Sequence, residues 1–228
     1  MILNPNKTKA LVVSRSRSVN HPHSDLVLSR VSICTSPNLD ILGVKFDNRL
    51  TFKDNVRGIV SRVSQRIGIL RLVKRVFVDT SVLIRCYYAF VLQILEYSSP
   101  VCGSAAECHL QLLERQVYSV ARLCPDQTFL SLCYRRHVAA LCILCKVNSN
   151  SNHCLFSGLP SLSVRVRRTQ ATAATHPLEF EVLSCRTTQF TRCIPPAQTL
   201  VRNDLPYTVF DNRTLDGFKG AVNRWLLP

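Results

Sequence analysis

The clearest pattern in the chain is an apolar stripe with helical spacing between residues 51 and 75. Apolar residues recur there at steps of three and four, namely Phe52, Val56, Ile59, Val63, Ile67 and Leu70. At about 100° per residue these positions fall on one side of a helix. The pattern therefore predicts a long amphipathic helix whose stripe faces a core. Thr51, followed three residues later by Asp54, predicts a capping box at its start.

The first fifty residues follow a different pattern, with short apolar runs separated by turn residues. The runs predict strands over 10–13, 25–28, 31–34 and 41–46, with Pro22 and Pro37 in the turns between them. An isolated hairpin is only marginally stable in water, so a few short strands need a neighbour that covers them. We therefore expect this region to be a piece of a larger protein.

Further helical patterns follow the long stripe. Residues 79–97 predict a mostly apolar helix. Ser104 and Glu107 predict a capping box for a helix that runs to about Leu123. Residues 126–147 predict another helix, and its inward positions are Leu132, Val138, Leu141, Cys142, Leu144 and Cys145.

After residue 147 the pattern loosens. The stretch following Asn148 is rich in Asn and Ser, which is typical of a linker or a surface loop. We expect a short strand over 178–183 and a last helix over 212–226. The last helix has Leu215, Phe218, Val222 and Trp225 on one side.

These elements together predict an α+β fold. Its parts are a small β-rich region over 1–50, a mainly α-helical bundle over 51–147, and a linker with a loosely structured C-terminal region over 148–228. At 228 residues and 46% hydrophobic content, the chain is long enough to bury a core.

The charge is strongly basic and unevenly placed. The net charge is +15, from 29 Lys and Arg against 14 Asp and Glu, and residues 1–76 alone carry 14 basic and 4 acidic residues. Such an excess favours a polyanionic partner. No apolar run approaches the ~18 residues of a membrane-spanning helix, so we expect a soluble protein with no membrane partner.

The N-terminal residues 1–7 lack the apolar centre of a signal peptide, which predicts an intracellular protein, nuclear or cytoplasmic, that is not secreted. The 11 cysteines are then expected to be reduced thiols rather than a disulfide framework.

Much of the basic excess borders the apolar stripe of the 51–75 helix. On the helical wheel, Lys53, Arg57, Arg71, Lys74 and Arg75 fall on one flank, and Arg62 and Arg66 on the other. Asp54 is the acidic residue of this segment, and like charges at such density repel. Contacts with nucleic-acid phosphates explain this pattern; the alternative is a helix edged by solvated charge.

Motifs for other chemistry are weak. Cys142 and Cys145, with His137, His153 and Cys154 nearby in sequence, have the composition of a zinc site, but the spacing matches no common knuckle, so we favour buried thiols and no metal. No glycine-rich phosphate loop or nucleophile-base arrangement is visible. The sequence thus predicts no small-molecule substrate and gives no indication of the oligomeric state.

Several segments resemble non-LTR (LINE-type, jockey/CR1-like) retrotransposon reverse transcriptases. They are LNPNKTKALVVSRSRS (3–18), LDILGVKFDNRLTF (39–52), FVLQILEYSSPVCGSAAECHLQLLERQVYSVARL (90–123) and RRHVAALCILCKV (135–147). The resemblance implies the end of the palm, followed by the thumb and a post-thumb region. Within it, Lys7 matches a palm lysine near the incoming nucleotide, and Leu42, Gly43 and Val44 match the strand that holds the primer end.

The same resemblance implies that this stretch of chain does not polymerise. The catalytic aspartates of the family precede the segment that matches residues 4–9, and the sequence contains no Asp-Asp pair. Mg²⁺ is therefore expected only in an intact polymerase, and no cofactor is expected here. The expected activity is nonspecific binding of RNA or an RNA/DNA hybrid.

The alternative function is a helical interaction or structural module, or a decayed reading frame with no nucleic-acid role. It is favoured by Cys102 and by the Val201-Arg202 pair, which stand where the family customarily has Trp.

Overall fold

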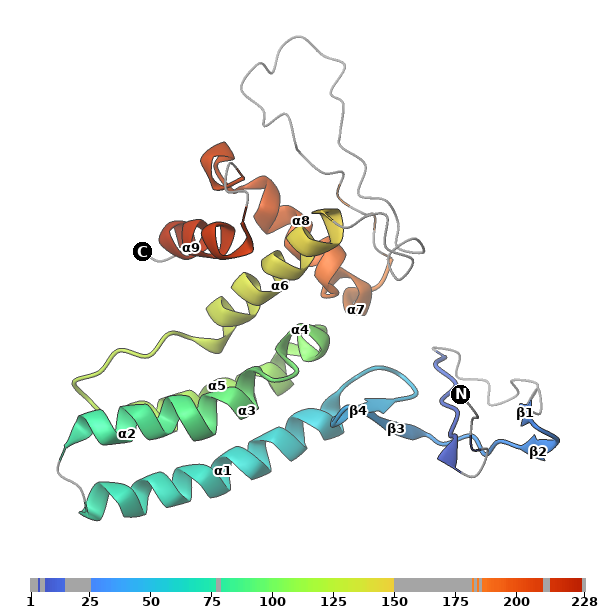
Figure 1. The fold of residues 1–228 in the computed structure, drawn as a ribbon, viewed down its shortest axis with the longest axis horizontal. Coiled ribbons are helices and arrows are strands. Elements are labelled where there is room, and N and C mark those ends of the chain that lie inside the picture. The colour runs from blue at the N-terminus through green and yellow to red at the C-terminus, as the bar shows by residue number, and fades with distance from the viewer. Residues whose placement is uncertain are drawn as a thin grey trace, which may run out of the picture.

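The computed structural model of the chain describes residues 4, 7–14, 26–76, 79–149, 182, 184, 186–210 and 214–226. The fold is α+β, as predicted: two small antiparallel hairpins precede a set of packed helices. Figure 1 shows the helices at one end of the molecule and the hairpins, with the N-terminal segment, at the other.

The longest helix, α1 (Lys53–Val76), organises the first hydrophobic core. All six residues of its predicted stripe are buried, from Val56 and Val63 at 0% exposure to Phe52 at 4%. The stripe packs against the helical segment 80–96, which begins with α2 (Thr80–Cys86). It also packs against α5 (Glu107–Ala121). The predicted helix and its inward face are confirmed.

The predicted helix over 79–97 forms with an interruption. After α2, the segment η2 (Tyr87–Leu92) is π-helical, and α3 (Gln93–Glu96) and the short α4 (Ser99–Cys102) continue the chain. Tyr87 is 1% exposed and its ring meets Phe129 edge-on at 4.9 Å between centroids. Tyr87 is therefore a core residue.

A second core lies on the other side of α6 (Leu132–Ser149). It is completed by α8 (Ile194–Asn203), the 3-10 turn η3 (Tyr207–Val209) and α9 (Leu215–Leu226), and the short α7 (Thr188–Thr191) precedes α8. The C-terminal region thus holds more regular structure than expected. On the predicted apolar side of α9, Phe218 and Val222 are buried, whereas Trp225 near the end of the helix is 42% exposed.

The β-rich region consists of two hairpins, β1 (Val27–Leu28) with β2 (Val31–Ser32), and β3 (Asn38–Ile41) with β4 (Val44–Asp47). The prediction of one strand over 41–46 is wrong because the chain reverses at Leu42 and Gly43. Both have positive φ, 49° and 78°, which is the requirement of the type I′ turn that suits a two-residue hairpin. Residues 10–13 form no strand beyond a single bridge from Ala10 to Thr35.

Three helix starts differ from the predictions. The Asp47 carboxylate fixes the turn before α1, because it accepts hydrogen bonds from the backbone N–H groups of Thr51 and Phe52 at 3.0 and 2.8 Å. The expected Ser104 cap does not form, since Ser104 Oγ donates to the Val101 carbonyl. Helix α6 begins at Leu132 rather than near 126, and the Leu132 N–H donates to the carboxylate of Glu114.

The predicted strand over 178–183 and the zinc candidates His153 and Cys154 lie outside the described residues, apart from Val182, which is not in a strand.

Candidate nucleic-acid interface

All the basic side chains predicted on α1 are exposed to solvent: Lys53, Arg57, Arg62, Arg66, Arg71, Lys74 and Arg75. Asp54 is the one acidic residue of this helix. Within the described ranges, the ion pair found within 4.0 Å joins Arg135 Nη1 to Glu96 Oε1 at 2.9 Å, on other helices. The positive charge of α1 is therefore not neutralised by carboxylates of the described part, and it is available to an anionic partner.

The larger flank of α1 borders α5. Ser64 Oγ donates to Gln116 Oε1 at 3.1 Å, which places the Ser64 side of α1 against α5. Arg57 and Arg71 lie seven residues before and after Ser64, on the same side of the helix. We call Lys53, Arg57, Arg71, Lys74 and Arg75 the α5-side flank. Lys74 also has a structural role, since its Nζ donates to the Leu123 carbonyl at 2.7 Å.

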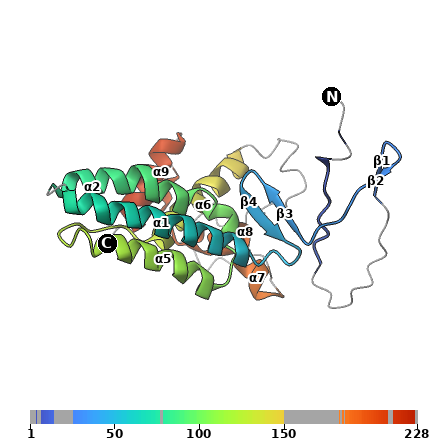
Figure 2. The same cartoon turned by 90° about the horizontal axis from the view of Figure 1, so that it is seen from below.

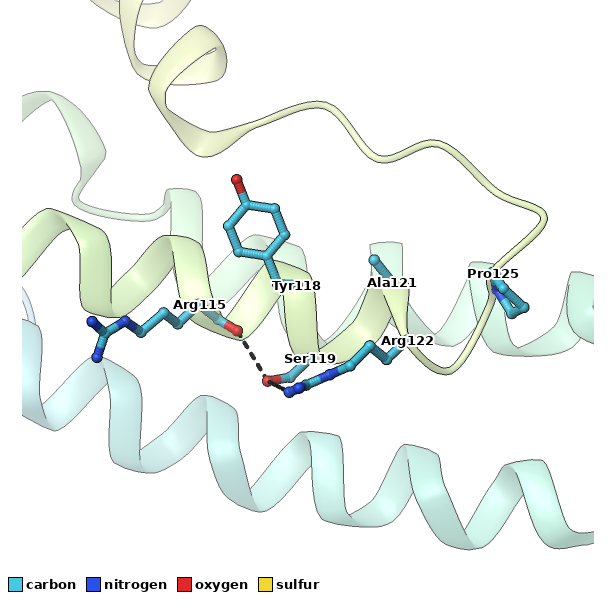
Figure 3. Close-up of a pocket in the computed structure, with 6 residues that line it drawn as sticks. All are labelled: Arg115, Tyr118, Ser119, Ala121, Arg122 and Pro125. Atoms are coloured by element: carbon cyan, nitrogen blue, oxygen red, sulfur yellow. Dashed lines mark hydrogen bonds between the residues drawn. The ribbon is translucent and has the colours of Figure 1, made fainter.

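Helix α5 adds two arginines that sequence reasoning missed. Arg115 and Arg122 line a shallow hollow on its outer side, and Figure 3 shows them along one edge of the helix with Ser119 between them. Arg122 Nη2 donates to Ser119 Oγ at 3.2 Å, and Ser119 Oγ donates to the Arg115 carbonyl at 2.9 Å. Their seven-residue spacing, which places both on one side of α5, was a usable signal in the sequence.

The smaller flank of α1, Arg62 and Arg66, lies on the opposite side of the stripe. Arg62 lines a hollow of about 360 Å³ together with Leu42, Gly43 and Tyr97. Tyr97 Oη donates to the Leu42 carbonyl at 2.7 Å and so holds α3 against the β3–β4 turn. The structure thus brings two of the three primer-grip-like residues beside a basic residue of α1.

The third primer-grip-like residue, Val44, is 7% exposed and belongs to the first core, so it offers no surface to a ligand. Leu42, by contrast, is 84% exposed at the tip of the turn.

Lys7 lies apart from the other predicted residues. It is exposed in the segment 7–14, which Figures 1 and 2 place beyond the β3–β4 hairpin from α1. The structure therefore does not bring Lys7 together with the basic flanks of α1.

A buried polar cluster fixes the hairpin to the helices. Asn55 is 5% exposed; its Oδ1 accepts from the Lys45 N–H at 3.0 Å, and its Nδ2 donates to Cys102 Sγ at 2.9 Å. Ser98 Oγ lies 3.5 Å from Asn55 Nδ2. Burial raises the pKa of the Cys102 thiol despite its hydrogen bonds with Ser98 and Asn55, which lower it, so the thiol stays protonated at neutral pH. Asn55 thereby positions the turn beside α1.

Other chemistry finds little support. Cys142 and Cys145 are half-buried and pack against the second core, and no group of three His, Cys, Asp or Glu in the described part of the chain could hold a metal ion. Among the helices that are described, none is long and apolar enough to cross a membrane.

Comparison of the chain with protein-family models, with curated proteins and with solved structures gave no match. The case for a function therefore rests on the sequence and on the geometry above.

Proposed function

We propose that this chain binds RNA or an RNA/DNA hybrid through the basic flanks of α1. We also propose that it corresponds to the end of the palm, the thumb and the post-thumb region of a non-LTR retrotransposon reverse transcriptase. The observation that carries the binding proposal is the α5-side flank, where five exposed cations line one side of a rigid helix. The assignment to a polymerase rests on the resemblance of the quoted segments.

The mode of binding follows from the side chains. Lysine and arginine on a helix surface contact phosphate oxygens, which occur in every sequence, so the interaction does not select bases. Each neutralised phosphate releases bound counterions, so affinity falls steeply with salt. The hollow beside Arg62 adds an aromatic ring, Tyr97, which is 66% exposed and suited to contact an unpaired base. These groups hold a strand in place and perform no bond chemistry.

Fluorescence anisotropy with labelled single-stranded RNA and with an RNA/DNA hybrid tests this function. With five phosphate contacts, affinity for RNA is expected to fall about 100-fold between 50 and 200 mM salt. The triple variant Arg57→Glu, Arg71→Glu, Arg75→Glu is expected to bind RNA roughly 100-fold more weakly at 50 mM salt. Circular dichroism checks that the variant remains helical.

A matched control separates a specific surface from total charge. Arg186, Lys219 and Arg224 are exposed on other elements, and their replacement by Glu changes the net charge by the same amount. We expect this control to retain most of the affinity for RNA. Equal loss in both triple variants, or no binding of wild-type protein even at 50 mM salt, removes the proposal.

A second candidate, a helical interaction module, is favoured by one observation. Ile69, Leu72 and Val76 are 54%, 59% and 74% exposed, and their spacing places them on one outer side of α1. If the wild-type chain fails to bind RNA, this apolar side is the remaining candidate surface. The neutral substitution Leu72→Gln is expected to leave RNA affinity within twofold if phosphate contacts dominate, because it changes no charge.

A further inference from the structure

A small cavity lies where four helices meet, away from α1. Its volume is about 180 Å³, and its walls come from α4, the start of α5, the first half of α6, and α8. At roughly 30 Å³ per water molecule it has room for about six waters, which is too little for a typical drug-sized ligand. A small ion, or one group at the end of a larger ligand, fits this space.

One wall carries an unsatisfied polar atom. Gln198 lines the cavity and is 6% exposed, and its Oε1 is buried with no hydrogen-bond partner in the described part of the chain. A buried acceptor without a partner costs about 1–3 kcal/mol, so native structures nearly always provide a donor. The cavity therefore needs an occupant that donates a hydrogen bond.

The other walls supply positive charge. Arg136 and Arg192 line the cavity, and neither forms an ion pair with a described carboxylate within 4.0 Å. Burial, together with the neighbouring Arg136, lowers the pKa of His137, so its ring is neutral at pH 7 and offers one N–H donor. The exposed Glu107 at the rim is a second acceptor.

Two helices begin at the cavity. Its lining includes Glu107 and Ile194, the first residues of α5 and α8, and neither helix has a side-chain cap at its start. The start of α5 exposes backbone N–H groups and a partial positive charge, which favours anions. The start of α8 offers fewer donors, because Pro195 and Pro196 follow Ile194 and have no N–H. The start of α5 thus adds to the two guanidinium groups and to the unpaired Gln198 oxygen.

We propose that this cavity, lined by Arg136, His137, Arg192 and Gln198, binds a protonated phosphate, either as the free ion or as the terminal phosphate of an RNA strand. The guanidinium groups and the start of α5 match the anionic oxygens. The P–OH group donates to Gln198 Oε1, which no oxygen of sulfate can do at neutral pH. The site therefore discriminates between two anions of nearly equal size and charge.

Titration calorimetry of the full chain with sodium phosphate and with sodium sulfate, both at pH 7 in chloride buffer, tests this site. We expect saturable 1:1 binding of phosphate and binding of sulfate weaker by about tenfold or more, because sulfate leaves the buried acceptor unpaired. Because Arg192 is exposed, the substitution Arg192→Gln is expected to weaken phosphate binding about tenfold without affecting the fold. The control Arg186→Gln, outside the cavity, is expected to bind as wild type does.

The variant Gln198→Leu tests the selectivity itself, since it should bring the phosphate-to-sulfate affinity ratio close to one. Simple loss of stability would not produce this effect.

A short RNA with a 5′-phosphate, compared with the same RNA bearing a 5′-hydroxyl, distinguishes the two sources of the phosphate. Tighter binding of the 5′-phosphate RNA that Arg192→Gln abolishes identifies the terminal phosphate. Absence of phosphate binding in the wild type, or equal affinity for phosphate and sulfate, overturns the proposal. Neither result bears on the flanks of α1, whose binding of internal phosphates is measured with 5′-hydroxyl RNA.

Discussion

Helices α1 and α9 are built on the same plan but carry different charge. Each buries one apolar side, α1 in the first core and α9 in the second. The polar side of α9 mixes Asp216 with Lys219 and Arg224, as solvated helices usually do. The polar side of α1 has seven basic residues against Asp54. Amphipathicity alone therefore does not account for the charge of α1, and this difference supports the proposal that α1 binds an anionic partner.

The two cores also treat buried polar groups differently. In the first, Asn55 is satisfied by partners on β4 and α4. In the second, Arg202 is 8% exposed and lies 4.5 Å from the centre of the Phe210 ring. Burial lowers the pKa of Arg202 to about 10, so it remains charged at neutral pH, and the ring face helps to stabilise the cation. The positive charge in the second region is thus partly internal, whereas that of α1 faces solvent.

The largest expected effect of a single substitution tests whether the second core is needed for stability but not for RNA binding. Phe218→Ala removes a 3% exposed ring and should lower the free energy of unfolding by about 4 kcal/mol. The protein that remains folded should bind RNA with unchanged affinity. Denaturant unfolding and anisotropy at low temperature measure the two quantities. A loss of RNA affinity in the folded fraction would remove the distinction between the two regions.

A pair of substitutions on α1 separates its core side from its outer side. Ile67 is 1% exposed and Ile69 is 54% exposed. Ile67→Ala should cost about 3 kcal/mol of unfolding free energy, and Ile69→Ala less than about 0.5 kcal/mol. Urea titration of both variants provides the measurement. Similar costs at the two positions would mean that the first core is not packed around the stripe as described.

A smaller effect is expected in the turn before α1. Burial raises the pKa of Asp47, but hydrogen bonds from Thr51, Phe52 and Arg49 outweigh it and hold the pKa below its usual value. Asp47→Ala removes these bonds and should cost about 1 kcal/mol of stability at pH 7. The difference from wild type should shrink as the pH falls through the folded-state pKa, because the protonated carboxyl loses its advantage. A constant difference in stability down to pH 2 would argue against a role of the ionised Asp47 carboxylate in this turn.

The smallest predicted effect is a pH dependence that comes from His137. Its pKa is lowered from 6.5 by burial and by Arg136. The unfolded chain therefore takes up a proton first as the pH falls below about 6.5, so the contribution of the neutral ring to stability is present above that pH and is lost below it. His137→Gln should flatten this part of the stability profile, as thermal unfolding between pH 5 and 8 can measure. An unchanged slope would mean that another group titrates there.

Local patterns in the sequence predicted the stripe of α1 well, because apolar residues at steps of three and four lie on one side of a helix whatever elements cover that side. The reversal at Leu42 was missed because leucine is an unusual residue at positive φ, and Gly43 alone did not signal a type I′ turn. The role of Asp47 in the turn before α1 was missed because Thr51 and Asp54 offered a more familiar pattern nearby.

The arrangement of the site was beyond local reasoning. The sequence separates the basic residues of α1 into two flanks, but it does not tell which helix covers the space beside each. The α5-side flank borders α5 only through the packing that brings Ser64 to Gln116, and the hollow beside Arg62 forms only because Tyr97 meets the β3–β4 turn. Contacts of this kind join residues that are tens of positions apart in the chain. The periodicity of one helix does not tell which distant residues it will contact.

The most direct test of the central claim is the slope of log affinity against log salt concentration for single-stranded 5′-hydroxyl RNA. Five phosphate contacts from the α5-side flank predict a slope of about −3.5, and the Arg57→Glu, Arg71→Glu, Arg75→Glu variant should reduce its magnitude by about 2. A wild-type slope near zero, or the same slope in wild type and variant, would contradict the assignment of the basic flank of α1 as the nucleic-acid interface.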